Sequence, residues 1–275
     1  MLLMRYPGGK AKAVTLSYDD GITQDIKLMQ IMKKHGIKGT FNINGGLFPD
    51  KDSDVGKMSA AQVKKLYSDS GNEVALHCYS HAHLEDLSYD MIRAEIMKDR
   101  LAIEKIFGTI VRGMAYPYGT FNDEVIRCAK SCGIIYSRTT ISTESFSLPH
   151  EWLKFNPTCH HNNPNLFDLV KNFLSDKRSD YSDPCTLFYL WGHSYEFDRD
   201  NNWDRIEKFA DMIGGHDDIW YAANIEICEY VKAYRSLIFS ADGMTVKNPT
   251  SVCVWVVNNE KLTEIKPGET VYFSE

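Results

Sequence analysis

The feature that most constrains the fold of this chain is a repeated alternation of short apolar runs with longer amphipathic stretches. Residues 13–18 form an apolar run, and residues 25–35 then show a helical spacing that Gly36 ends. Residues 40–43 are then expected to form a second strand. Such an alternation is typical of strand–helix–strand units with parallel strands. It predicts an α/β fold built on a mostly parallel sheet or barrel.

The same pattern continues to about residue 235. Ser59 and Gln62 have the spacing of a capping box, which predicts the start of a helix that reaches about residue 70. The other expected elements are strands at 73–76, 113–116 and 187–191 and helices at 89–107, 123–132 and 202–213. The long helix at 89–107 is expected to bury Met91, Ile92, Ile96, Leu101 and Ile103.

The composition changes after about residue 235. Residues 252–257 and 262–265 suggest two strands joined by a turn at Asn258 and Asn259, and residues 271–273 suggest a third strand. The length of 275 residues suits one large barrel with a small addition. We therefore expect a (β/α) barrel domain at 1–237 and a small β-strand appendage at 238–275.

Composition and charge exclude several classes of function. Hydrophobic residues make up 43% and charged residues 25% of the chain, which is typical of a folded soluble protein. The net charge of -6, without a run of Lys and Arg, argues against nucleic acid and membrane partners. No apolar run has the length of a signal peptide or a membrane span, so we expect a cytoplasmic protein. The seven cysteines, an odd number, are expected to be reduced core thiols.

Two adjacent carboxylates follow the first predicted strand. Asp19 and Asp20, before Gly21, come directly after the buried run at 13–18. The carboxyl ends of parallel strands are where α/β folds place their sites. A lone Asp-Asp-Gly segment is nevertheless more often a polar turn, because Asp makes local hydrogen bonds and Gly tolerates positive φ.

Two histidines follow the strand predicted at 73–76. His77 and His81 are four residues apart, so one turn of helix-like backbone would aim both imidazoles at one point. Together with a carboxylate they would form a metal triad that leaves coordination positions open for water and substrate. An isolated pair of this spacing is often accidental, but both motifs at successive strand ends are much less so.

Four segments together resemble the polysaccharide deacetylases, the NodB-homology group known as carbohydrate esterase family 4. Residues 16–21 resemble the family motif TFDDG, and residues 77–81 resemble H[ST]xxH. Residues 114–119 resemble the third motif, FRxPYG, and residues 190–193 resemble the late strand that carries a second catalytic histidine. The resemblance spans roughly residues 10 to 235 and implies a distorted (β/α) barrel with fewer than eight strands.

The resemblance also implies a metal site. Asp20, His77 and His81 would bind one divalent ion, for which zinc is the first expectation. Cobalt, nickel and manganese also suit an Asp/His₂ site with open positions.

The catalytic roles that the resemblance implies fall on other residues. Asp19 would take a proton from the attacking water, and His193 would protonate the departing amine. The backbone N–H of Tyr118 would stabilise the oxyanion. Pro117, Tyr118 and Trp191 are expected to line the substrate site, with Trp191 offering an aromatic face for a sugar.

The chain departs from the family pattern at several positions. Ala115 stands where the third motif usually has an arginine, and Arg112 or Arg138 is a candidate replacement. Cys78 stands where Ser or Thr is usual, and we expect it to pack in the core and not to bind metal. His160 and His161 are adjacent, point in different directions and are not expected at the metal.

The predicted function is removal of an N-acetyl group from an N-acetylated sugar, whether a monomer, an oligomer or a polysaccharide. Because of Ala115, an amidase that cleaves another non-peptide C–N bond, as in allantoinase-like or imidase-like relatives, is the alternative. An inactive carbohydrate-binding protein is a third hypothesis, against which the complete set of candidate catalytic residues argues. The expected partner is a carbohydrate or small amide substrate, and the sequence leaves the oligomeric state open.

Overall fold

The structure is a computed structural model that describes residues 2–176, 184–258 and 261–273. Its centre is a curled sheet of parallel strands. Seven strands follow one another in space in the order β6 (Tyr136–Arg138), β5 (Gly113–Ala115), β4 (Glu73–Leu76), β3 (Gly39–Ile43), β2 (Lys12–Asp19), β8 (Thr186–Gly192) and β7 (Cys159–His160). The prediction of a distorted (β/α) barrel is confirmed, because the sheet curls as in this fold class.

The strand β2 is the centre of the sheet. All eight of its residues are buried, as expected for a parallel strand that is covered on both faces. Its first half pairs with β9 (Ile219–Tyr221) and its second half with β3, while β8 runs along its other edge. The carboxyl end of β2 therefore has close neighbours on both sides.

The open side of the sheet, between β6 and β7, is bridged by the segment that precedes β7. The backbone N–H of Phe155 donates to the carbonyl of Ser137 on β6 at 2.9 Å. Three residues later, the N–H of Thr158 donates to the carbonyl of Tyr189 on β8 at 2.8 Å. This segment ties the two ends of the sheet together and brings the residues after β7 close to those after β6.

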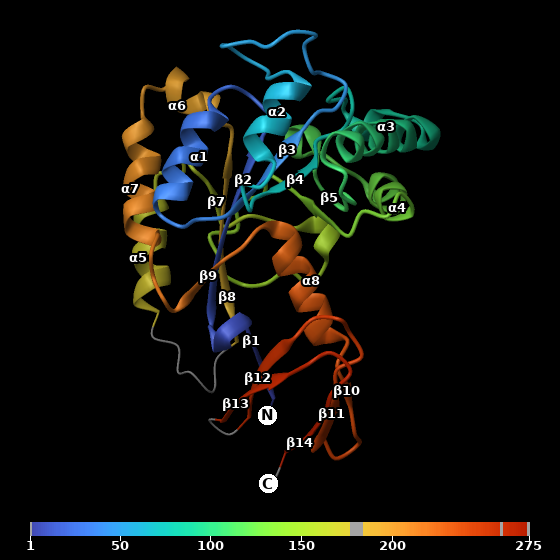
Figure 1. The fold of residues 1–275 in the computed structure, drawn as a ribbon, viewed down its shortest axis with the longest axis vertical. Coiled ribbons are helices and arrows are strands. Elements are labelled where there is room, and N and C mark those ends of the chain that lie inside the picture. The colour runs from blue at the N-terminus through green and yellow to red at the C-terminus, as the bar shows by residue number, and fades with distance from the viewer. Residues whose placement is uncertain (1, 177–183, 259–260, 274–275) are drawn as a thin grey trace.

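Eight helices are described, and the longer ones surround the sheet (Figure 1). They are α1 (Asp25–Lys34), α2 (Ala60–Tyr67), α3 (Tyr89–Phe107), α4 (Asp123–Ser131), α5 (Leu166–Ser175), α6 (Tyr195–Arg199), α7 (Trp203–Ile213) and α8 (Asn224–Arg235). Short 3-10 turns lie at Pro7–Gly9, Leu84–Asp86, Pro117–Gly119 and Trp152–Lys154. The capping box predicted at Ser59 and Gln62 is confirmed at the start of α2.

The predicted apolar face of α3 is partly wrong. Ile92, Ile96 and Ile103 are buried as expected, but Met91 is 54% and Leu101 is 63% exposed. The inward stripe of α3 instead includes Asp99, one helical turn after Ile96. Asp99 is buried because its carboxylate accepts backbone hydrogen bonds from loops at the sheet edge.

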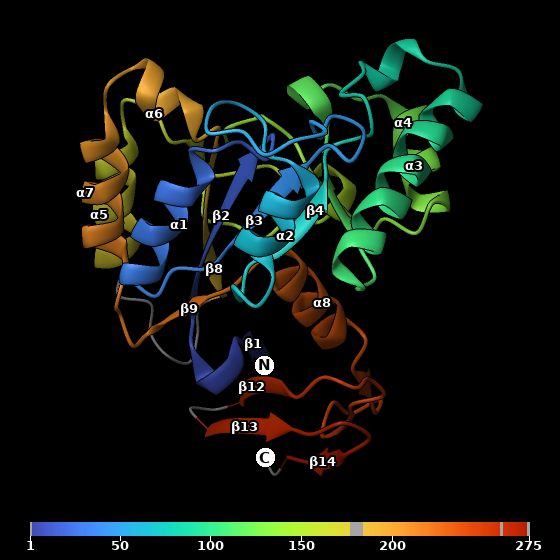
Figure 2. The ribbon, with the colours of Figure 1, turned by 45° about the horizontal axis from the view of Figure 1, so that its top comes forward.

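Two small antiparallel sheets lie at the amino-terminal end of the barrel strands (Figure 2). One contains β1 (Leu3–Arg5), β12 (Val254–Asn258) and β13 (Lys261–Ile265), and the other contains β10 (Ile238–Phe239), β11 (Thr245–Lys247) and β14 (Thr270–Tyr272). Val246, Val254, Val256 and Ile265 form their shared core with Leu237. The boundary at residue 237 stays a prediction, and the first of these sheets includes a strand from the N-terminus.

Three smaller predictions can be set against the structure. Strands are confirmed near 252–257, 262–265 and 271–273, whereas the turn predicted at Asn258 and Asn259 falls partly outside the described residues. All seven cysteines are free thiols, and all but Cys253 are buried. Among the described residues, no helix combines the length and the apolar character needed to cross a membrane.

Candidate active site

The residues predicted to carry the chemistry meet at the carboxyl edge of the sheet. Asp19 is the last residue of β2, His77 follows β4, and His193 follows β8. Arg138, the last residue of β6, reaches the same place. These parallel strands all end at this edge. The fold therefore brings together side chains that are up to 174 positions apart in the sequence, as Asp19 and His193 are.

Three side chains converge as the predicted metal ligands would. The ligand atoms of Asp20, His77 and His81 all lie within 4.8 Å of one another. The Nε2 atoms of the two histidines are 3.1 Å apart, and Asp20 Oδ1 is 3.9 Å from His81 Nε2. Ligands of a tetrahedral zinc ion lie about 3.4 Å from one another. A small inward movement of Asp20 would therefore complete a site for one divalent ion.

The backbone that presents these ligands is left-handed at several non-glycine residues. Asp20 has a φ of 84°, and Cys78 and His81 have φ values of 62° and 58°. The expected helix-like turn between His77 and His81 is therefore wrong, because two left-handed residues fold this segment into an irregular loop. Non-glycine residues with positive φ cost free energy and gather at functional sites, where the surrounding structure holds them.

The tautomer of His77 suits metal binding. His77 Nδ1 lies 3.0 Å from the backbone carbonyl of Ala115, a group that can only accept a hydrogen bond. The Nδ1 atom must therefore carry the proton, which leaves a lone pair on Nε2 facing Asp20 and His81. Burial lowers the pKa of His77 to about 4 against the opposing effect of Asp19, which also favours the neutral, ligating form.

Two buried side chains hold the His77 loop. Asn44 donates through Nδ2 to the carbonyls of His77 and Cys78, at 2.6 and 2.9 Å. Asp99 accepts the backbone N–H of His77 at 3.1 Å and that of Gly45 at 2.5 Å. Burial raises the pKa of Asp99 to about 8, although these hydrogen bonds oppose the rise. The position of His77 is thus fixed from the strand β3 and the helix α3.

Asp19 is held by a cation and an amide. Its Oδ2 atom accepts a hydrogen bond from Arg138 Nη2, and its Oδ1 atom accepts one from Asn42 Nδ2 at 2.8 Å. Both Asp19 and Arg138 are buried. Burial opposes ionisation of Asp19, but the charge of Arg138, with those of His77 and His193, outweighs it and lowers the pKa to about 2. Asp19 is therefore an anion at neutral pH.

Arg138 lies where the missing arginine of the third motif is needed. Of the two candidate replacements for the residue at Ala115, Arg138 contacts Asp19, whereas Arg112 pairs with Glu229 on the surface at 3.6 Å. The guanidinium of Arg138 also stacks over the ring of Trp191, 4.5 Å from its centroid. The cation beside the candidate base Asp19 thus comes from β6, the strand next to β5, which carries Ala115.

His193 faces Asp19 with one nitrogen and Glu196 with the other. Its Nε2 atom is 3.8 Å from Asp19 Oδ2, and its Nδ1 atom is 3.6 Å from Glu196 Oε2. Burial lowers the pKa of His193, but the nearby carboxylate of Glu196 and the charges of Asp19 and Asp20 outweigh it, so the net direction is upward. This raises the protonated fraction of His193 near neutral pH.

Glu196 gathers two more histidines. Its Oε2 atom lies 3.0 Å from His160 Nε2 and 3.1 Å from His161 Nε2. His160, His193 and Glu196 could hold a metal ion by distance alone. However, the backbone N–H of Asn162 donates to His160 Nδ1 at 3.1 Å, so a neutral His160 carries its proton on Nε2, facing Glu196. The arrangement favours a group of histidines gathered around the charge of Glu196 over a second metal site.

The remaining predicted residues lie around this centre. Tyr118 has a φ of 58°, is 53% exposed and stacks on His83 with ring centroids 3.7 Å apart, while the edge of its ring meets His81. Pro117, the preceding residue, is buried. Trp191 is only 9% exposed, so most of its ring packs inside the protein. Cys78 is buried in the hydrophobic core, as expected.

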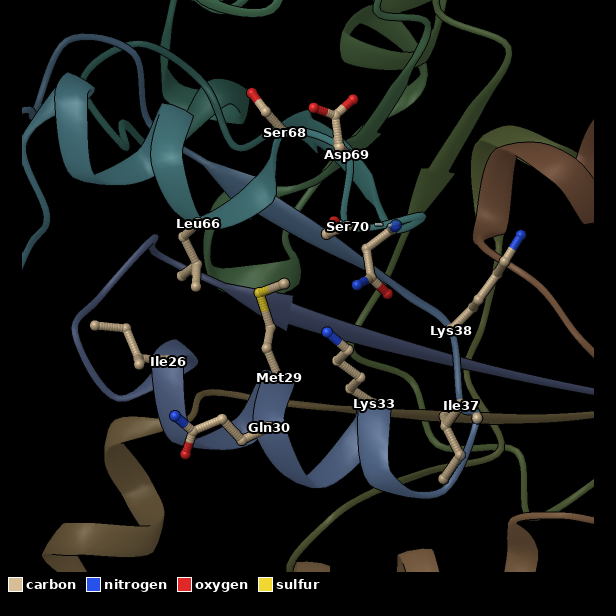
Figure 3. A pocket seen from close by; sticks show the side chains of 12 residues that line it. Ile26, Met29, Gln30, Lys33, Ile37, Lys38, Leu66, Ser68, Asp69 and Ser70 are labelled. Atoms are coloured by element: carbon tan, nitrogen blue, oxygen red, sulfur yellow. Dashed lines mark hydrogen bonds between the residues drawn. The ribbon is translucent and has the colours of Figure 1, made fainter.

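The larger surface pockets lie away from this centre. A pocket of about 510 Å³ is lined by residues of α1 and α2, among them Met29, Lys33 and Leu66 (Figure 3). Its other walls include residues just before β3 and β4, at the amino-terminal edge of the sheet. The chemistry therefore does not coincide with this cavity.

Sequence reasoning missed several residues that shape the site. Asn42 carried a detectable signal, because it is a polar residue in a predicted strand. Asp99 and Asn44 gave little signal in the sequence, because their role depends on hydrogen bonds to backbone groups of a loop far away along the chain.

Comparisons with known proteins bear on the family and the fold of the chain. Residues 6–137 match the model of the family described as Polysaccharide deacetylase. A peptidoglycan-N-acetylmuramic acid deacetylase from Bacillus subtilis is 27% identical over 129 residues, which are 45% of this chain and 45% of that protein. The chain thus spans about half the length of the curated relatives that it matches.

Solved structures share the fold. A candidate polysaccharide deacetylase from Mycobacterium smegmatis has a TM-score of 0.58 at 16% identity, over 85% of this chain and 94% of that one. A carbohydrate esterase family 4 pseudoenzyme from Bacillus anthracis has a TM-score of 0.50 at 19% identity, over 82% of this chain and 68% of that one. The fold thus occurs both in candidate deacetylases and in a pseudoenzyme.

Proposed function

Because this chain belongs to the polysaccharide deacetylase family, we propose that it is a metal-dependent hydrolase that removes an N-acetyl group from an N-acetylated sugar and releases acetate. The observation that carries the proposal is the position of Asp19. Its Oδ2 atom lies 3.8 Å from His77 Nε2 and 3.8 Å from His193 Nε2. A carboxylate thus stands between the candidate metal ligands and the candidate acid.

The residues of the candidate metal site fit a divalent ion, since two imidazole nitrogens and a carboxylate oxygen converge and the tautomer of His77 leaves its lone pair inward. When bound, such an ion would act as a Lewis acid on the acetamide carbonyl and make water a better nucleophile. Zinc is the first candidate for this set of ligands, with cobalt, nickel and manganese as alternatives.

Asp19 serves as the base in this proposal. It is ionised and fixed in orientation by Arg138 and Asn42, so it can accept a proton from the attacking water without first moving. The ion pair with Arg138 keeps Asp19 charged inside the protein, although it also makes the carboxylate a weaker base.

His193 serves as the acid. Its Nδ1 atom faces Glu196, so Nε2 is the nitrogen that faces the reacting groups beside Asp19. An amine leaves readily only when it is protonated, and the negative charges of Glu196 and Asp19 favour the protonated imidazole. The pKa of Asp19 is thus shifted downward and that of His193 upward, the opposite directions that an acid–base pair requires.

The substrate would meet an aromatic wall beside the metal ligands. Tyr118 is half exposed, and its ring is held from one side by His83 and at its edge by His81. An exposed aromatic ring of fixed orientation suits the apolar face of a sugar. Trp191 is mostly covered by the protein and stacks against Arg138, so its ring offers little free surface to a sugar.

The main argument for another amide substrate was the loss of the family arginine at Ala115. Arg138 supplies that charge beside Asp19, which favours the sugar deacetylase over an allantoinase-like or imidase-like enzyme. An inactive binding protein would have no need for surroundings that shift the pKa of Asp19 downward and that of His193 upward.

The test is an acetate-release assay on N-acetylglucosamine and its oligomers of increasing length. The metal is removed with a chelator and then added back, and the Asp19→Asn variant is the matched control. We expect release of acetate that needs both the metal and Asp19. A folded protein that binds metal yet releases acetate from none of these sugars would contradict the proposal, and allantoin and cyclic imides would then be assayed.

A further inference from the structure

A lysine reaches the candidate metal site from the long connection between β3 and α2, which extends above α2 in Figure 1. Lys57 lies near the end of this connection. Its backbone position is fixed because the N–H of Thr23 donates to the carbonyl of Gly56 at 2.8 Å, and the N–H of Met58 donates to that of Gly21 at 3.1 Å. The connection is thus tied to the loop that follows Asp20 on both sides of Lys57.

The ammonium of Lys57 shares an oxygen with the candidate metal site. Lys57 Nζ is 3.3 Å from Asp20 Oδ1 and donates to the carbonyl of Asp20 at 3.1 Å. Asp20 Oδ1 is also the oxygen that lies 3.9 Å from His81 Nε2. One carboxylate oxygen therefore faces both a fixed cation and the position between the ligands.

The same ammonium is linked to the loop that carries the other ligand. Lys57 Nζ donates to Asn44 Oδ1 at 3.1 Å, and Asn44 donates through Nδ2 to the carbonyl of His77 at 2.6 Å. One amide side chain thus connects Lys57 to His77. The side chain of Lys57 is 32% exposed, so its charge is only partly screened by water.

We propose that Lys57 is an internal competitor for the metal ion. Its ammonium holds Asp20 and the His77 loop in place when the site is free of metal, and it lowers the affinity of these three ligands for a divalent cation. The inference rests on the proposed function for the identity of the metal ligands. It assigns to Lys57 a role in setting how readily the ion is bound and exchanged, separate from the chemical step.

The expected size of the effect follows from Coulomb's law. A unit positive charge a few ångströms from a divalent ion changes the affinity by about tenfold at the dielectric constant of bulk water, and by more in a partly buried site. Replacing Lys57 by a neutral residue should therefore tighten binding by this order. Lys57→Arg keeps the charge and should leave the affinity near that of the wild type.

The experiment measures the affinity of metal-free protein for zinc in competition with a chelating dye. Lys57→Gln keeps a donor for the carbonyl of Asp20, and Lys57→Met removes it, so the pair separates charge from hydrogen bonding. Lys64→Gln, at an exposed position on α2, is the control for loss of a lysine elsewhere. We expect tighter zinc binding in Lys57→Gln and Lys57→Met, with no change in Lys57→Arg and Lys64→Gln.

A second readout tests the structural half of the inference. Without metal, Lys57→Met should melt below the wild type, and saturating zinc should raise its melting temperature by more than it raises that of the wild type. Zinc affinity of Lys57→Gln and Lys57→Met equal to or weaker than that of the wild type would overturn the inference while leaving the metal site standing. Failure of the wild type to bind zinc would instead refute the metal site, and this inference with it.

Discussion

Replacing Arg138 by methionine tests the ion pair that fixes the candidate base. Arg138 is buried, and Asp19 is the hydrogen-bond partner of its Nη2 atom. Its Nε and Nη1 atoms have no hydrogen-bond partner among the described residues. Methionine preserves much of the apolar length of the side chain but leaves the Asp19 carboxylate buried without its cation.

The magnitude follows from the pKa of Asp19. A fall from the ordinary value of 3.8 to about 2 corresponds to about 2.5 kcal/mol of stability at neutral pH. This is a net figure, because burial opposes it. Removing one partner of a buried ion pair typically costs about 3–5 kcal/mol. For a chain of this length we expect the melting temperature to fall by about 10 °C.

The sign of the pH dependence is fixed by the lowered pKa. The contribution of Asp19 is fully present above its ordinary pKa near 3.8 and is lost as the pH falls toward 2. In Arg138→Met the carboxyl has lost the charge that lowers its pKa, so it should take up a proton at a higher pH. The difference in stability between wild type and variant should therefore shrink on acidification.

The assay is a double-mutant cycle on metal-free protein, followed by denaturant unfolding at pH 7. Asp19→Asn and Arg138→Met should each be strongly destabilising, whereas the double variant should recover about 2–4 kcal/mol relative to their sum. Arg112→Met is the control, because Arg112 and Glu229 form an exposed pair expected to contribute about 0–1 kcal/mol. Simple additivity of the two buried changes would refute the account of Asp19.

Three further predictions concern the site. Asp20→Asn should lose metal affinity, whereas Asp19→Asn should keep the metal and lose turnover, as metal analysis and acetate assays would show. Equal loss of metal in both variants would contradict distinct roles for the two aspartates. His193→Ala should lower kcat by about 10²–10⁴-fold and abolish the alkaline limb of the pH–rate profile, and wild-type turnover would contradict its role as the acid. Burial raises the pKa of Asp25 to about 7, against hydrogen bonds from Ser194 and Tyr67, so its stabilising contribution is present at low pH and lost as the pH rises through 7. The melting temperature should therefore fall more between pH 5 and pH 9 in the wild type than in Asp25→Asn, and parallel curves would count against this.

The main strands of the fold could be predicted because buried strands appear in the sequence as short apolar runs. The run at 13–18 became β2, and the apolar run at 187–191 became β8, which together place Asp19 and His193. The strands β7 and β9 could not be found in the same way, since they have only two and three residues and owe their pairing to the neighbouring β8 and β2.

At the site, local sequence patterns do not predict which residues come together. Arg112 and Arg138 were equivalent candidates in the sequence. In the structure Arg112 precedes β5 and Arg138 ends β6, so Arg112 lies at the amino-terminal ends of the strands and Arg138 at their carboxyl ends. The end of a three-residue strand is too weakly marked in sequence to separate them. Lys57 was likewise hidden, because its role depends on the folding of its loop onto Asp20.

The pairing of β1 with β12 has a consequence for how the molecule can be attached. Leu3, Met4 and Arg5 lie beside Val257, Val256 and Trp255, so both ends of the chain emerge in one region, at the end of the barrel away from the carboxyl edge of β2 (Figure 2). A fusion partner or a solid support joined to either terminus would leave the opposite edge facing outward. Immobilised in this way, the protein would keep the edge of the sheet that carries Asp19 and His193 turned toward the solution.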